Sequence, residues 1–122
     1  MLRILYVEDN PDSFRPVKRI AAYEGYELYT AETVKAGLSI IQNHSPTLIL
    51  LDMHLPDGTA VEFTRQVREQ GLTCPIVVIT GYTFEKERDA CFTAGCTEFL
   101  IKPVEVHTFI ELFQRYNEDR IP

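Results

Sequence analysis

Five short apolar runs rich in β-branched residues divide the chain, and segments of a different periodicity follow them. The runs are LRILYV (2–7), YELYT (26–30), TLILL (47–51), PIVVIT (75–80) and EFLI (98–101). After each run, apolar residues recur at helical spacing, although segment 84–95 is only weakly amphipathic. This alternation predicts a doubly wound α/β fold, a five-stranded parallel sheet with helices on both faces. No linker or repeat interrupts it, so we expect one domain over residues 1–122.

Polar residues stand where several of these runs end. Glu8 and Asp9 follow the first run, Asp52 follows the third, Thr80 ends the fourth and Lys102 follows the fifth. The carboxyl ends of parallel strands meet at one edge of the sheet, and binding sites of such folds form there. We therefore expect these residues to lie together in one pocket.

The chemistry of these side chains suits a phosphoryl group held beside a metal ion. If runs 2–7 and 47–51 pair, three carboxylates meet, and their mutual repulsion requires either a proton or a cation. Mg²⁺ fits best, because it prefers a few carboxylate oxygens and keeps several waters. Lys102 and Thr80 could hold phosphoryl oxygens while Asp52 acts as a nucleophile, which would give an aspartyl-phosphate.

Each of these residues also has a purely structural interpretation. Glu8 and Asp9 could cap the first helix, and Asp52 could begin a turn with the proline and glycine that follow. Thr80 could be an ordinary strand residue and Lys102 an exposed charge. A common position at the ends of their strands favours a site over these separate explanations.

Composition narrows the classes of function. The formal net charge is −6, which disfavours binding to nucleic acid or to an anionic membrane. No apolar stretch reaches the roughly 18 residues of a membrane helix, and the first residues lack the features of a signal peptide. Three cysteines without a CxxC pair are expected to be reduced thiols in a cytoplasmic protein. Zinc bound by Cys91, Cys96 and a histidine is a minor alternative.

The order and spacing of four motifs resemble the receiver domain of bacterial two-component response regulators. The motifs are ILYVEDNPD, LILLDMHLPDG, VVITGY and GCTEFLIKPV, and together they extend over essentially the whole chain. The resemblance implies the flavodoxin-like strand order 2-1-3-4-5 for the five-stranded sheet. It also implies a signalling switch rather than an enzyme, with only self-catalysed phosphoryl acceptance and slow autodephosphorylation.

Carried over residue by residue, the resemblance implies a role for each member of the pocket. Asp52 would accept a phosphoryl group from a phosphohistidine on a sensor histidine kinase or a histidine phosphotransfer protein. Asp9 would ligate Mg²⁺ directly, Glu8 would act through water, and Asp52 would supply a further oxygen. His54 would contribute only its backbone carbonyl. Lys102 would contact the phosphoryl group.

The resemblance also implies how the signal leaves the site. Thr80 would move toward the phosphoryl group, and Phe99 would turn inward and change the face formed by the fourth helix, fifth strand and fifth helix. A downstream protein partner would dock there, around Phe92, Phe99 and segment 105–120. His54 and Tyr82 would edge the pocket and restrict attacking water. We expect a stand-alone receiver, while a receiver within a longer regulator or hybrid kinase stays open.

Three other functions compete with this interpretation. A Mg²⁺-dependent phosphohydrolase of the haloacid-dehalogenase kind would place two aspartates one residue apart after the first strand, whereas this chain has Glu8-Asp9-Asn10-Pro11. A flavodoxin-like cofactor binder needs a loop rich in Gly, Ser or Thr at that point, and the acidic EDNPD would repel a phosphate. An interaction module that works without phosphorylation stays open.

Overall fold

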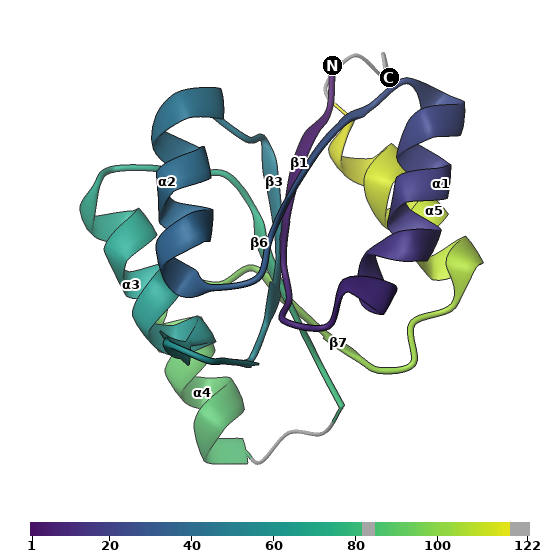
Figure 1. Cartoon of the computed structure of the whole chain (residues 1–122). Helices are drawn as coiled ribbons and strands as arrows, with labels where there is room; N and C mark the ends of the chain where they lie inside the picture. The colour runs from purple at the N-terminus through teal and green to yellow at the C-terminus, as the bar shows by residue number, and fades with distance from the viewer. Residues whose placement is uncertain (82–84, 118–122) are drawn as a thin grey trace.

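A five-stranded parallel sheet forms the centre of the molecule in the computed structural model, which describes residues 1–81 and 85–117 (Figure 1). The strand order is β2-β1-β3-β6-β7, so the five long strands follow the expected order 2-1-3-4-5. Their bounds are β1 Arg3–Val7, β2 Glu27–Ala31, β3 Leu48–Asp52, β6 Ile76–Thr80 and β7 Glu98–Ile101. Two further short strands, β4 (His54–Leu55) and β5 (Gly58–Thr59), form a separate antiparallel hairpin that the sequence analysis did not predict.

Helices cover both faces of the sheet, as a parallel sheet requires (Figure 1). They are α1 Arg15–Glu24, α2 Val34–His44, α3 Ala60–Glu69, α4 Glu85–Ala94 and α5 Val106–Tyr116. The helices α2, α3 and α4 lie on one face, and α1 and α5 lie on the other (Figure 1). A short 3₁₀ helix, Pro11–Phe14, precedes α1, so Pro16 falls in the first turn of α1, where its missing N–H is tolerated. The predicted fold class is confirmed.

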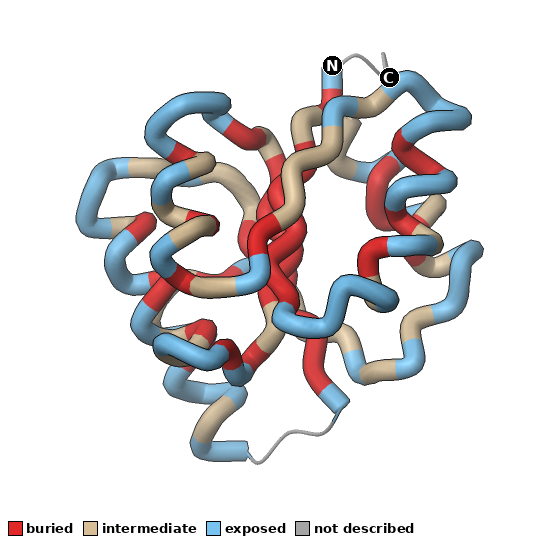
Figure 2. The backbone as a smooth tube through the Cα atoms, viewed as in Figure 1, coloured by how far each residue is buried: buried red, intermediate tan, exposed pale blue. Residues whose placement is uncertain are grey.

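Alternate residues of each strand enter two different hydrophobic cores. On β1, Leu5 and Val7 pack with Phe63 beneath α2 and α3, while Ile4 packs with Phe113 of α5 on the opposite face. The central strands are consequently buried along their length, as the red core of the sheet shows (Figure 2). This two-sided burial is why the runs read as continuous apolar stretches instead of alternating ones.

Strand register brings the ends of the long strands to one edge. Val7 lies opposite Leu51, Asp52 opposite Ile79, and Thr80 opposite Ile101. The predicted pairing of runs 2–7 and 47–51 is therefore confirmed, and the polar residues that end these strands lie on neighbouring positions.

The described residues include all three cysteines and all the helices that can be compared with the expectations about thiols and membrane spans. All three cysteines are free thiols, and Cys91 and Cys96 are buried. In the part of the chain that the structure describes, no helix is long and apolar enough to cross a bilayer.

Candidate functional site

Three carboxylates meet at the C-terminal edge of the sheet. Glu8, Asp9 and Asp52 each offer an oxygen, and these oxygens all lie within 4.8 Å of one another. Glu8 is only 1% exposed, and its backbone N–H donates to the Ala31 carbonyl at 2.9 Å, which continues the β1–β2 pairing. Asp9 is exposed and Asp52 is intermediate, so the cluster opens to solvent on the Asp9 side. The sequence prediction that these acids converge agrees with this geometry.

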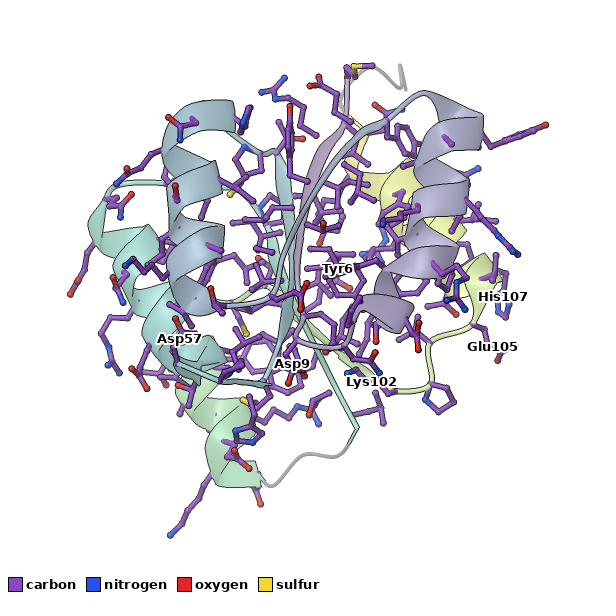
Figure 3. All side chains as sticks on the ribbon, in the orientation of Figure 1. Tyr6, Asp9, Asp57, Lys102, Glu105 and His107 are labelled. Atoms are coloured by element: carbon purple, nitrogen blue, oxygen red, sulfur yellow. The ribbon has the colours of Figure 1, made fainter. Side chains whose placement is uncertain are left out.

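Lys102 approaches the cluster from the end of β7, and Figure 3 shows it beside Asp9 at this edge. Its Nζ atom lies 2.6 Å from Oε1 of Glu8 and 3.7 Å from Oδ1 of Asp52. Its backbone N–H donates to the Thr80 carbonyl at 2.8 Å, which fixes the start of the segment after β7. One ammonium group therefore serves two carboxylates, and it lies much closer to the more buried one.

This unequal sharing sets the protonation behaviour of the site. Burial raises the pKa of Asp52, and the nearby charge of Glu8 adds to the effect, so the pKa reaches about 6 despite the attraction of Lys102. Burial also acts to raise the pKa of Glu8, but hydrogen bonds from Lys102 and from the Asn10 N–H outweigh it and leave that pKa below its ordinary value. Burial opposes the ammonium charge of Lys102, yet its two carboxylate partners raise its pKa. Of these two carboxylates, Asp52 is thus the one whose charge Lys102 compensates less.

Thr80 and His54 lie in elements that adjoin Asp52 in the sheet or in the chain. Thr80 is buried at the end of β6, one position beyond the residue opposite Asp52. His54 lies in β4, and its Nε2 atom is 3.1 Å from a carboxylate oxygen of Glu87 on α4. The imidazole is therefore engaged with α4. Tyr82 lies outside the described residues.

Two of the structural alternatives do not hold. The side chain of Asn10, not of Glu8 or Asp9, caps the 3₁₀ helix by accepting from the Asp12 N–H at 3.1 Å. Asp52 is the last residue of β3 and pairs opposite Ile79, so it belongs to the sheet and not to a turn.

Tyr6 is a neighbour of the site that the sequence analysis did not single out. It is 2% exposed and packs edge-to-face on Phe14, with ring centroids 5.2 Å apart. Burial, followed by the charges of Glu8 and Asp52, raises the pKa of its hydroxyl, which stays protonated. The signal was available in the sequence, since Tyr6 precedes Glu8 by two residues and strand residues at that spacing share a face.

Known proteins share this architecture and sequence pattern. The family model of the response regulator receiver domain matches residues 4–114. The KDP operon transcriptional regulatory protein KdpE of Escherichia coli is 34% identical over 84% of this chain and 45% of its own length. The polar-differentiation response regulator DivK of Brucella ovis is 26% identical over 95% of this chain and 96% of its own length. The crystal structure of a CheY-like receiver domain protein of Methanospirillum hungatei is 29% identical with a TM-score of 0.88, covering 94% of this chain and 92% of that one.

The chain belongs to the response regulator receiver domain family. This assignment is consistent with two-component signalling and makes histidine kinases the general class of partner. The receiver domain spans about half the length of KdpE but nearly all of DivK.

The donor set of this receiver domain fits the Mg²⁺ ion that receiver domains bind at their acidic pocket. All three candidate side chains present hard carboxylate oxygens, the ligands that Mg²⁺ prefers. One of them is exposed, which leaves room for the waters that Mg²⁺ retains. Among the described residues, this is the one group of three or more His, Cys, Asp or Glu side chains close enough to hold a metal, so the zinc alternative gains no support.

Phe99 of β7 lies on the face that α4, β7 and α5 form. Its ring centroid is 5.6 Å from that of Phe92, and the guanidinium of Arg88 lies 6.0 Å above it. Phe92, Ile101 and Val106 are exposed hydrophobic residues on these elements. The face thus combines exposed apolar side chains with an aromatic residue that is itself only partly buried.

Proposed function

We propose that this receiver domain is a phosphoryl-accepting switch in which Asp52 takes a phosphoryl group from a phosphohistidine on a sensor kinase or a phosphotransfer protein. The observation that carries the proposal is the environment of Asp52. It is a partly exposed carboxylate at a strand end, with two further acids within 4.8 Å and a lysine ammonium 3.7 Å away. We take residues 1–122 to act as one receiver unit. Their free cysteines fit a reducing compartment such as the cytoplasm.

The transfer exchanges one bond for another. An oxygen of the Asp52 carboxylate attacks phosphorus, the P–O bond forms and the P–N bond to the donor imidazole breaks. The bonding pair returns to the imidazole nitrogen, which then takes up a proton. With a pKa of about 6, Asp52 is mostly ionised at neutral pH and is available as the nucleophile.

The other side chains prepare the pocket for a dianionic group. Asp9, Asp52 and the His54 backbone carbonyl would hold Mg²⁺, with Glu8 acting through water; the bound ion would supply positive charge to offset that of the phosphoryl oxygens. Lys102 already lies beside Asp52 and needs only to exchange part of its contact with Glu8 for one with a phosphoryl oxygen. Thr80 ends the neighbouring strand and would donate its hydroxyl to the same group.

Phosphorylation would change the packing of the α4–β7–α5 face. Movement of Thr80 toward the phosphoryl group favours the packing in which Phe99 turns inward, a shift between two arrangements of one face. Since Phe99 has no hydroxyl, this change would travel through ring packing against Phe92 and Arg88. A downstream protein partner would bind the exposed apolar residues of the same face.

Intact-mass spectrometry after incubation with acetyl phosphate tests the proposal, with and without Mg²⁺. Wild-type protein should gain one phosphoryl adduct only when Mg²⁺ is present, and Asp52→Asn should gain none. Asp12→Asn is the matched control, because Asp12 is an exposed acid outside the carboxylate cluster, and it should behave as wild type.

Each other outcome points to a different function. No adduct on wild-type protein would overturn the proposal in favour of a phosphorylation-independent interaction module. Steady release of inorganic phosphate from a range of phosphomonoesters would favour the phosphohydrolase instead.

A further inference from the structure

A short hairpin connects the end of β3 to the start of α3, directly after the candidate phosphoacceptor. In it, His54 pairs with Thr59 and Leu55 with Gly58, so that the turn consists of Pro56 and Asp57. Only one residue separates Asp52 from the hairpin. The hairpin therefore determines where the backbone around His54 lies relative to Asp52.

Asp57 ties the tip of this hairpin to a different part of the chain. Its Oδ1 atom accepts from the Val34 N–H at 2.7 Å and its Oδ2 atom from the Lys35 N–H at 3.1 Å. These are the first two amides of α2, which have no partner within the helix. The two hydrogen bonds hold the pKa of Asp57 below its ordinary value, so the carboxylate is charged at neutral pH. Figure 3 shows Asp57 at this end of α2.

Three other contacts hold the hairpin in place. The Ala60 N–H donates to the Met53 carbonyl at 2.9 Å, and Leu55 is buried in the core beneath α2 and α3. Gly58 lies so close to α2 that a Cβ atom there would be 3.1 Å from a methyl group of Val34. These contacts hold the base and middle of the hairpin, and the Asp57 carboxylate holds its tip.

We propose that Asp57 is a positioning residue for the acceptor site, fixing the hairpin so that the His54 carbonyl stays in place as a metal ligand beside Asp52. The inference rests on the proposed function and deepens it. Asp57 touches no reacting atom and acts through the two α2 amides and the hairpin backbone. Groups that orient metal ligands in this indirect way commonly change metal affinity when they are removed.

The experiment compares Asp57→Ala and Asp57→Asn with Thr33→Ala. Thr33 is the matched control, because its side chain caps the same helix by accepting from the Ala36 N–H at 3.0 Å, yet it lies outside the hairpin. Mg²⁺ alone is titrated into each protein, and its dissociation constant is read from amide chemical shifts. Hydrogen exchange of the Ala60 amide reports on the hairpin, and acetyl phosphate labelling is followed at low and saturating Mg²⁺.

Asp57→Ala should raise the Mg²⁺ dissociation constant about tenfold, the lower end of the usual effect of such supporting groups. Its labelling should slow at low Mg²⁺ and recover at saturating Mg²⁺, and the Ala60 amide should exchange faster. Asp57→Asn keeps one acceptor oxygen and should fall between Asp57→Ala and wild type. Thr33→Ala should lower stability but leave the Mg²⁺ dissociation constant unchanged.

The failure of this inference differs from failure of the proposed function. If Asp57→Ala bound Mg²⁺ as tightly as the wild-type protein, the positioning role would be overturned. The proposed function would stand, because the wild-type protein would still be labelled by acetyl phosphate. An equal loss of affinity in Thr33→Ala would overturn it too, because the effect would then come from α2 in general. If wild-type protein itself neither bound Mg²⁺ nor accepted a phosphoryl group, the proposed function would fail, and the inference with it.

Discussion

Asp52→Asn should stabilise the fold in the absence of metal. The wild-type carboxylate is largely buried, with 14% of its side chain exposed, and lies near the charge of Glu8, which raises its pKa from 3.8 to about 6. A carboxyl group whose pKa is raised on folding binds its proton more tightly in the native state. This tighter proton binding contributes favourably to the free energy of unfolding. The contribution is complete below pH 3.8 and is lost as the pH rises through about 6.

The expected size follows from the pKa gap. The difference between 3.8 and about 6 corresponds to about 3 kcal/mol. Replacing the carboxylate by a neutral amide of the same shape removes this penalty. The gain in the free energy of unfolding should therefore be about 3 kcal/mol near pH 7.5 and roughly half of that near pH 5.

Urea unfolding in EDTA at these two pH values measures the gain. The chain has no tryptophan, so far-UV circular dichroism is the suitable signal. Asp89→Asn is the control, since it removes the same charge from an exposed position of α4 and should change stability little. Equal stability of Asp52→Asn and wild type at pH 7.5, or a gain that does not shrink at pH 5, would refute the reasoning.

Three further predictions concern other contacts. Lys102→Met leaves buried Glu8 without its partner 2.6 Å away and should lower the free energy of unfolding in urea by about 3 kcal/mol at pH 7. Adding Glu8→Gln to Lys102→Met should restore part of this loss, and a double variant with no gain in stability would contradict the explanation. Gly95→Ala should cost more than about 1 kcal/mol in urea unfolding, because φ is 115° and a Cβ would lie 2.8 Å from Arg68 Cγ; unchanged stability would argue against strain there. Although burial acts to raise the pKa of Glu98, hydrogen bonds from Arg115 and Tyr116 of α5 lower it. The ionised Glu98 carboxylate therefore adds to the free energy of unfolding above pH 4.5, and this contribution is lost on acidification. Glu98→Gln should therefore lower the melting temperature at pH 7 but hardly at pH 3. An equal decrease in melting temperature at both pH values would show that the Glu98 charge does not stabilise the fold.

Local sequence patterns predicted the five long strands and the helices between them, and they predicted that Glu8, Asp9 and Asp52 converge, but they did not predict the β4–β5 hairpin. Two-sided burial makes each central strand a short apolar run, so a polar residue such as Asp52 or Lys102 at the end of a run marks the sheet edge. The strand order, in contrast, could not be predicted from local sequence patterns. No periodicity within a strand specifies its neighbours, and the order 2-1-3-4-5 came from the resemblance alone.

The pattern could not reveal contacts between distant segments. The sequence PDG contains residues typical of turns, but nothing in it indicates that Asp57 accepts hydrogen bonds from amides 22 and 23 residues earlier in the chain. Glu8 and Lys102 are 94 residues apart, so their pairing depends on the register of the whole sheet. The helix that was hardest to predict, α4, has few apolar residues on one face because only Cys91 among its described residues is buried.

One arrangement explains why two substitutions in the same cluster should have opposite effects on stability. Lys102 lies 2.6 Å from Glu8 and 3.7 Å from Asp52, so it compensates the first carboxylate well and the second poorly. Removing the lysine leaves the buried Glu8 carboxylate without its cation, whereas neutralising Asp52 removes the charge that Lys102 compensates poorly. The poorly compensated charge on Asp52 would also make it the nucleophile and cation ligand of the proposed function. The stability lost at this position and the proposed reactivity of Asp52 therefore have the same physical origin, and a bound Mg²⁺ should reduce the stabilising effect of Asp52→Asn.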